Sequence, residues 1–333
     1  TEPAHYGPRH FDPSAEAAKL LNVNNERFVM KHDPVRKEGS TRDILARAIM
    51  LEILEGRGTP EGGVNMVPDP AVFDAFLKER PIYVKRLLEN YGEPQARFEA
   101  PIQVMPSALY TLGGIRIDAW CRTSVPGLLA AGEAAGGVHG ANRLGGSSMC
   151  DIQVFGRRAG IAAAQDAKAH ALPPGAGLEQ ARSRVAELTA PMYRTDGVRP
   201  VEVKRRIQKL MWDHVGIVRT ASKLEETLRA FTDLRENVLP RLKVTSTSRI
   251  LNREWMESLE LESMLDLAEA MAATSIERKE TRGAFYRTDF PDTDPQWTAN
   301  LWVRRAGGRI VVEKRLVDAF DTSAAIARRV AVS

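Results

Sequence analysis

Residues 123–150 combine residue types and spacing that are typical of a ligand-binding site. The apolar run 128–131 has the length of a buried strand, and the stretch from Gly132 to Gly146 contains six glycines, both ends included. Ser147 and Ser148 precede a helical pattern that continues to about residue 169. A strand, a glycine-rich turn and a helix start direct free N–H groups and a positive dipole end toward a ligand. Glu133 follows the strand, where α/β sheets hold cofactor hydroxyls. The segment predicts a cofactor site.

Composition narrows the class of protein. The chain has 333 residues and a net charge of +4 with mixed signs, which gives no support for nucleic-acid binding. No apolar run approaches the roughly 20 residues that span a bilayer, so we expect no direct membrane span. We also expect no signal peptide. Two cysteines are too few for an iron–sulfur cluster or a disulfide framework, and we expect no metal site. The dinucleotide-binding string Gly-x-Gly-x-x-Gly is absent.

The literal strings identify a family resemblance. Residues 130–133 read Ala-Ala-Gly-Glu, and residues 139–148 read His-Gly-Ala-Asn-Arg-Leu-Gly-Gly-Ser-Ser. Together they closely resemble the second FAD-binding segment of the succinate dehydrogenase and fumarate reductase flavoprotein family, which includes L-aspartate oxidase. Members carry the dinucleotide fingerprint in an N-terminal half, so the chain resembles the C-terminal part of a longer flavoprotein.

The resemblance implies FAD as the cofactor and assigns residues to it. Glu133 would bind the flavin's sugar-like chain, and Ser148 and Met149 would lie near the isoalloxazine ring, mainly through their backbone. Gly113 and Gly114 would also contact the cofactor. Arg143 would be the fork-shaped donor to a substrate carboxylate, a geometry that lysine cannot copy.

A second set of residues is implied in catalysis. Arg42 opens a predicted helix, which Ser40 or Thr41 can cap. A cation at that position opposes the helix dipole and so suggests a use other than stability. Residues 40–49 resemble the family string in which this arginine donates or accepts a proton, although pairing with an acid is the plain alternative. Thr1 and Glu2 resemble the family's substrate-contacting Thr-Glu pair, with an ordinary loop as the alternative.

One position departs from the family pattern. Residues 106–114 resemble the family string Pro-Thr-Ala-His-Tyr-Thr-Met-Gly-Gly, but Leu109 stands where the family has a histidine that binds a substrate carboxylate. Leucine offers no donor, and a polar group left unpaired costs about 1–3 kcal/mol. Residues 280–291 also match the family, with Phe285 in place of a second histidine.

The fold class expected is α/β plus α: an incomplete FAD-binding Rossmann-like domain with a capping-domain remnant, a helical bundle and a small C-terminal β-hairpin region. Strands are expected at 115–118 and 128–131. Helices are expected at about 178–192, 200–219, 222–238 and 252–278, a hairpin at 301–316, and a charged helical end after it. We expect a capping part at 1–98, the FAD segment at 99–170, a helical domain at 171–280 and a C-terminal region at 281–333.

The function expected is an FAD-dependent oxidoreductase of the succinate/fumarate type, acting on CH–CH groups of a dicarboxylate-like substrate. Leu109 leaves open a different substrate on the same scaffold, and a non-catalytic assembly protein is a further alternative. Family analogy implies an iron–sulfur subunit of an electron-transfer complex as partner. It also implies a cytoplasmic location, or a peripheral one on the inner face of a membrane through partners.

Overall fold

A computed structural model describes residues 18–79, 81–169 and 177–317, which form two compact units. The first unit contains the described residues up to 169 together with 283–285. The second contains 177–282 and 286–317. Thr1 and Glu2, and most of the expected charged helical end, lie outside the described residues. The four-part division of the chain stays a prediction.

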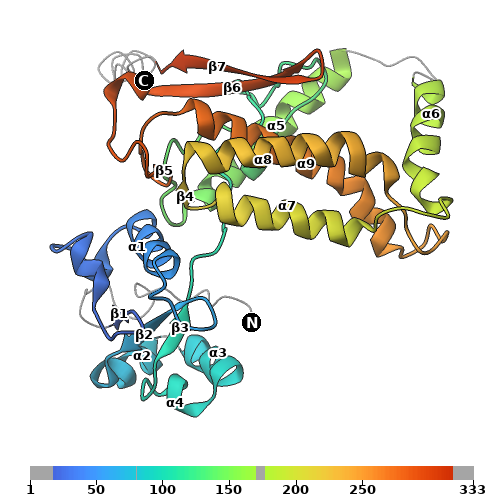
Figure 1. The fold of residues 1–333 in the computed structure, drawn as a ribbon. Coiled ribbons are helices and arrows are strands. Elements are labelled where there is room, and N and C mark those ends of the chain that lie inside the picture. The colour runs from blue at the N-terminus through green and yellow to red at the C-terminus, as the bar shows by residue number, and fades with distance from the viewer. Residues whose placement is uncertain (1–17, 80, 170–176, 318–333) are drawn as a thin grey trace, which may run out of the picture. The chain divides into compact units, whose positions relative to one another are not determined.

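The first unit begins with an antiparallel sheet of three strands in the order β1-β2-β3 (Figure 1). Every second residue of β2 is buried, and the register pairs Met66 with both Leu20 and Ile102, so apolar side chains gather on one face. Phe28 completes this core. The strands and helices of this part are β1 (Ala18–Leu21), α1 (Arg42–Leu54), β2 (Val64–Pro68), α2 (Phe73–Glu79), α3 (Pro81–Tyr91), α4 (Glu93–Ala96) and β3 (Ile102–Val104).

Helix α1 begins at Arg42, as its sequence predicts, but without the expected side-chain cap. Thr41 has extended backbone angles and its hydroxyl makes no capping hydrogen bond. Ser40 donates its hydroxyl to Asp33 Oδ2 instead, at 2.5 Å. The helix is therefore anchored by packing: Leu45, Ala48 and Ile49 are buried in the core.

The remainder of the first unit is an irregular chain followed by one long helix, α5 (Ser147–Ala169). The strands expected at 115–118 and 128–131 are wrong: each contributes only an isolated bridge, Ile115 to Ala135 and Leu129 to Arg122. A strand exists only where a neighbour completes its hydrogen-bond ladder. Within the described residues no parallel sheet forms beside these segments, so the Rossmann-like part of the expected fold is reduced to a 3₁₀ turn, η5 (Gly132–Ala134), and α5.

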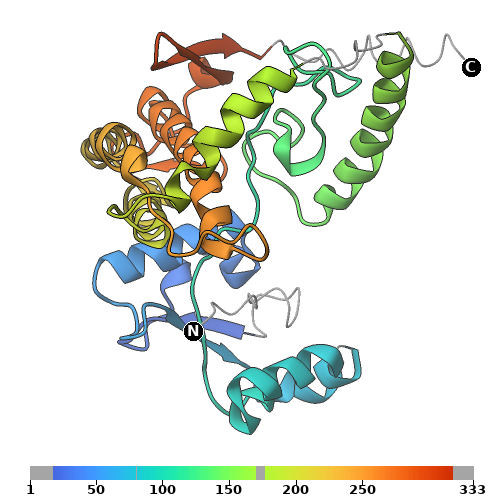
Figure 2. The same cartoon turned by 90° about the vertical axis from the view of Figure 1, so that its right-hand side faces the viewer.

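The second unit is built on helices, with α7, α8 and α9 side by side in both views (Figures 1 and 2). Its core lies between these three helices and includes Ile207, Phe231 and Leu265. The expected four helices and the hairpin are confirmed, with somewhat shorter helices. The elements are α6 (Leu178–Thr189), α7 (Pro200–His214), β4 (Val218–Arg219), α8 (Ala221–Asp233), α9 (Arg253–Glu277), β5 (Tyr286–Arg287), β6 (Ala299–Ala306) and β7 (Arg309–Leu316).

Two kinds of feature are absent from the described residues. No helix in the described part is long and apolar enough to cross a membrane. No group of three or more His, Cys, Asp or Glu side chains in the same ranges is arranged to hold a metal ion.

Phe231 is fully buried at the centre of the bundle core, which makes it a sensitive probe of the second unit. We expect Phe231→Ala to lower the free energy of unfolding by about 3–5 kcal/mol, because the ring's burial is lost and a cavity remains. Urea unfolding followed by circular dichroism measures this change. Arg229→Ala, on the exposed side of the same helix, is the matched control. A loss below about 1 kcal/mol for Phe231→Ala would contradict the packing described.

Candidate active site

Arg42 meets the glycine-rich loop at the N-terminal end of α1. Its guanidinium Nη2 lies 3.7 Å from the position that a Cβ on Gly145 would occupy. The next residue, Asp43, accepts a hydrogen bond from the Asn142 side chain through Oδ1 at 2.8 Å. The two contacts bring the first turn of α1 against the loop that carries Arg143. Two residues far apart in sequence therefore share one region of the first unit.

Arg143 lies in that loop with its guanidinium only partly used. Nη1 donates to the carbonyl of Leu144 at 3.2 Å and lies 3.4 Å from Ser148 Oγ. The guanidinium carbon stands 4.4 Å from the centre of the Tyr110 ring. Nε is buried and has no hydrogen-bond partner among the described residues. The charged group thus keeps donor capacity for an acceptor that the described residues do not provide.

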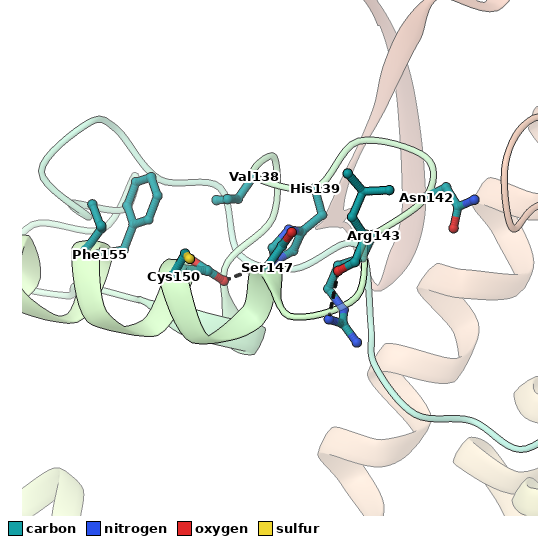
Figure 3. A pocket seen from close by; sticks show the side chains of 10 residues that line it. Val138, His139, Asn142, Arg143, Ser147, Cys150 and Phe155 are labelled. Carbon is teal, nitrogen blue, oxygen red and sulfur yellow. Dashed lines mark hydrogen bonds and ion pairs between the residues drawn. The ribbon is translucent and has the colours of Figure 1, made fainter. Parts of the chain in front are cut away.

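A pocket of about 410 Å³ opens beside this loop and the first turns of α5. Such a volume suits a small molecule or part of a cofactor. In Figure 3, Val138 and Phe155 lie at one end of the lining and Arg143 and Asn142 at the other, so the pocket has an apolar end and a polar end. Its lining is Val138, His139, Asn142, Arg143, Leu144, Ser147, Cys150, Asp151, Val154 and Phe155.

Three polar side chains meet beneath the loop. Asp151 Oδ2 accepts from the Tyr110 hydroxyl at 3.2 Å and lies 3.2 Å from His139 Nε2. The Tyr110 hydroxyl is 3.3 Å from the same His139 nitrogen. The Asp151 and His139 side chains are only 2% and 8% exposed. Sequence reasoning missed Tyr110 and Asp151. The sole sequence signal was a carboxylate at the fifth residue of the helix that follows the glycine-rich loop.

Glu133 and the glycines at 113 and 114 also come together. Glu133, exposed in η5, accepts from the backbone N–H of Thr111 through Oε1 at 2.8 Å. Ile115 N–H donates to the Ala134 carbonyl at 2.8 Å, which draws the two segments into contact. A Cβ on Gly114 would stand 2.5 Å from that carbonyl oxygen, so glycine is required there. Gly113 is open on its Cβ side.

The expected flavin-ring neighbours lie at the start of α5. Ser148 and Met149 occupy its first turn, with Met149 exposed. Leu109 is also exposed, next to Tyr110, and offers no donor. The structure thus brings Arg42 to the Arg143 loop, and separately brings Glu133 to the 111–115 segment.

Comparison with known proteins identifies the family. A family described as the fumarate reductase flavoprotein C-terminal region matches residues 204–330, and an FAD-binding domain family matches residues 12–149. The chain is 39% identical to a fumarate reductase (CoM/CoB) subunit of Methanothermobacter marburgensis, over 87% of this chain and 51% of that protein. The chain belongs to the succinate dehydrogenase and fumarate reductase flavoprotein family. The chain spans about half the length of the curated relatives it matches.

Two further relatives confirm the family assignment. The succinate dehydrogenase flavoprotein subunit of Rickettsia bellii is 32% identical over 85% of this chain and 49% of that protein. Among solved structures, Escherichia coli quinol fumarate reductase superposes with a TM-score of 0.82 at 28% identity. That superposition covers 93% of this chain and 56% of the other. The chain therefore shares the fold of part of that structure.

FAD is the cofactor of this family. The residues of the described site can contact part of the FAD molecule. Glu133 uses Oε1 for Thr111, and Oε2 has no hydrogen-bond partner within the described ranges, so it can accept from a cofactor hydroxyl. Gly146, at the start of α5, has a φ of 83°, and nothing lies within 4 Å of the place where a Cβ would stand. The backbone there is open to a ligand at a helix start. This donor and acceptor set fits the hydroxyl-bearing and ring portions of a flavin.

Proposed function

We propose that this chain is the substrate-handling part of an FAD-dependent oxidoreductase that acts on the CH–CH bond of a dicarboxylate-like molecule. FAD, when bound, supplies hydride-transfer chemistry. Arg143 binds a substrate carboxylate, and Arg42 holds the proton that is exchanged with the adjacent carbon. The observation that carries the proposal is the contact of Arg42 with the Arg143 loop, secured by the Asn142–Asp43 hydrogen bond.

The chemistry of the two arginines supports distinct roles. A guanidinium presents a planar fork of N–H donors that matches a carboxylate, and Nη2 of Arg143 has no hydrogen-bond partner among the described residues. A free guanidinium keeps its proton above pH 12, so Arg42 can exchange one only where water is excluded and a neighbour relays the proton. Asp43 is held by Asn142 rather than by Arg42 in the contacts described, which leaves the Arg42 guanidinium free of that carboxylate.

A different substrate on the same scaffold is the second candidate. The observation that favours it is Leu109: an exposed apolar side chain beside Tyr110, where the family resemblance places a carboxylate-binding histidine. A substrate with one carboxylate, or with an uncharged group facing Leu109, would lose no hydrogen bond at that position.

The names of the relatives also suggest a component of an electron-transfer complex, and we propose an iron–sulfur partner.

The proposed activity is tested on the FAD-loaded, full-length protein by fumarate-dependent oxidation of reduced methyl viologen. We expect turnover, and we expect Leu109→His to raise kcat/KM for fumarate by about tenfold, because the imidazole supplies the missing donor. Leu128→His, at another exposed leucine of the same unit, is the matched control. Absence of turnover from both the wild type and Leu109→His would reject fumarate and favour the second candidate.

A further inference from the structure

Tyr110 joins the loop that carries Arg143 to a buried polar cluster. Its ring lies under the guanidinium, with the Arg143 Cζ 4.4 Å from the ring centre. Its hydroxyl donates to Asp151 Oδ2 at 3.2 Å and lies 3.3 Å from His139 Nε2. The His139 ring packs edge-on against the Tyr110 ring, with centres 5.3 Å apart and planes at 80°. One side chain is therefore held at its hydroxyl and at its ring.

Asp151 and His139 restrain the Tyr110 side chain through its hydroxyl. Asp151 projects from helix α5, and its carboxylate is almost completely buried together with His139. Removal from water, followed by the hydrogen bond to Asp151, raises the pKa of the Tyr110 hydroxyl. The hydroxyl consequently keeps its proton and continues to donate to Asp151 throughout the neutral pH range.

Arg143 has few other restraints on its position. It lies in a glycine-rich loop outside regular structure, and its hydrogen bonds go to Leu144 and Ser148, both close in sequence. These bonds are 3.2 and 3.4 Å long, and both are made by Nη1. The face of the Tyr110 ring attracts the cation and restricts that plane. Among the described residues, this contact ties the guanidinium to a segment about thirty positions away in the sequence.

We propose that Tyr110 is a positioning residue that orients Arg143, with Asp151 and His139 anchoring the tyrosine. The inference rests on the proposed function, in which Arg143 receives a carboxylate. A guanidinium that is already oriented loses less conformational freedom when it forms two parallel hydrogen bonds with that carboxylate. Tyr110 would then affect substrate binding without touching the substrate.

The orientation of Arg143 can be measured without any substrate. Phenylglyoxal modifies accessible guanidinium groups, and peptide mass spectrometry gives its rate at Arg143 in the FAD-loaded, full-length protein. We expect Tyr110→Leu to raise that rate about fivefold to tenfold, because removal of the ring frees one face of the group. Tyr110→Phe keeps the ring and loses the anchor, so its rate should lie between the wild type and Tyr110→Leu. Tyr193→Leu, at an exposed tyrosine of the second unit, is the matched control.

Kinetics give the second readout. We expect Tyr110→Leu to raise the KM for fumarate about tenfold while kcat changes less than about threefold, since binding and not the chemical step is affected. An unchanged modification rate at Arg143 in Tyr110→Leu would overturn the proposal. If that variant does not fold, the same result for Tyr110→Phe overturns it. Faster modification of Arg143 in a protein that does not reduce fumarate would uphold the positioning role and reject only the substrate.

Discussion

Arg42→Lys is expected to lower the kcat of fumarate reduction by about a hundredfold to ten thousandfold, the range of a lost general acid. Lysine keeps the positive charge at the start of α1, so the attraction of an anionic substrate persists. It replaces the planar fork by a single ammonium on a flexible stem, which cannot hold a proton at the same position against the loop at Gly145. The KM should therefore change much less than kcat. Steady-state assays with reduced methyl viologen separate the two constants.

The control for this prediction is an arginine of the same unit outside the site. Arg86→Lys changes an exposed residue of α3 and should leave both constants within about twofold of the wild type. FAD content, read from the absorption spectrum, confirms that each variant holds its cofactor. An Arg42→Lys protein with full FAD content and a kcat within about tenfold of the wild type would exclude Arg42 as the proton donor.

Arg143→Ala is expected to raise the KM for fumarate by about a hundredfold to a thousandfold. Its removal leaves a substrate carboxylate without its charged partner, and truncation of one member of a buried charged pair costs about 2–5 kcal/mol. Arg143→Lys should restore part of the loss, because the charge returns but the second parallel hydrogen bond does not. Perturbation of the flavin spectrum by a dicarboxylate inhibitor such as malonate measures binding independently of turnover.

The matched control for Arg143 is an exposed arginine on helix α5, which follows the Arg143 loop. Arg157→Ala removes this arginine and should leave malonate binding unchanged. Equal affinities in the wild type and in Arg143→Ala would show that the carboxylate is held elsewhere. A loss in Arg143→Ala that Arg143→Lys fully reverses would mean that charge alone matters and that the fork does not.

Local patterns predicted the helices well. Apolar residues at helical spacing located α7, α8 and α9 and their shared core, because a helix satisfies its own backbone hydrogen bonds and needs only one apolar side to pack. The hairpin β6–β7 was predicted for a related reason, since its two strands are neighbours in sequence. The strings around Arg143 and Glu133 also predicted the family, and the comparisons confirmed it.

Local patterns failed where a partner far along the chain decides the outcome. The apolar runs at 115–118 and 128–131 read as strands, yet each forms one bridge, because strand formation depends on neighbours that a local pattern does not contain. Ser40 read as a helix cap, but Asp33 competes for its hydroxyl. In the first case the neighbouring strands were missing, and in the second a hydrogen bond outside the helix took the hydroxyl.

The sequence by itself determined the family, the cofactor and the helices, and it selected Arg42 and Arg143 as the candidate site arginines. Only the tertiary structure decided that α1 meets the glycine-rich loop through Asp43 and Asn142, and that Tyr110 lies between Arg143 and the buried pair of Asp151 and His139. Residue types and helix periodicity are properties of neighbouring positions. A hydrogen bond or a ring–cation contact between distant segments depends on how the whole unit packs, and that cannot be read from either segment alone.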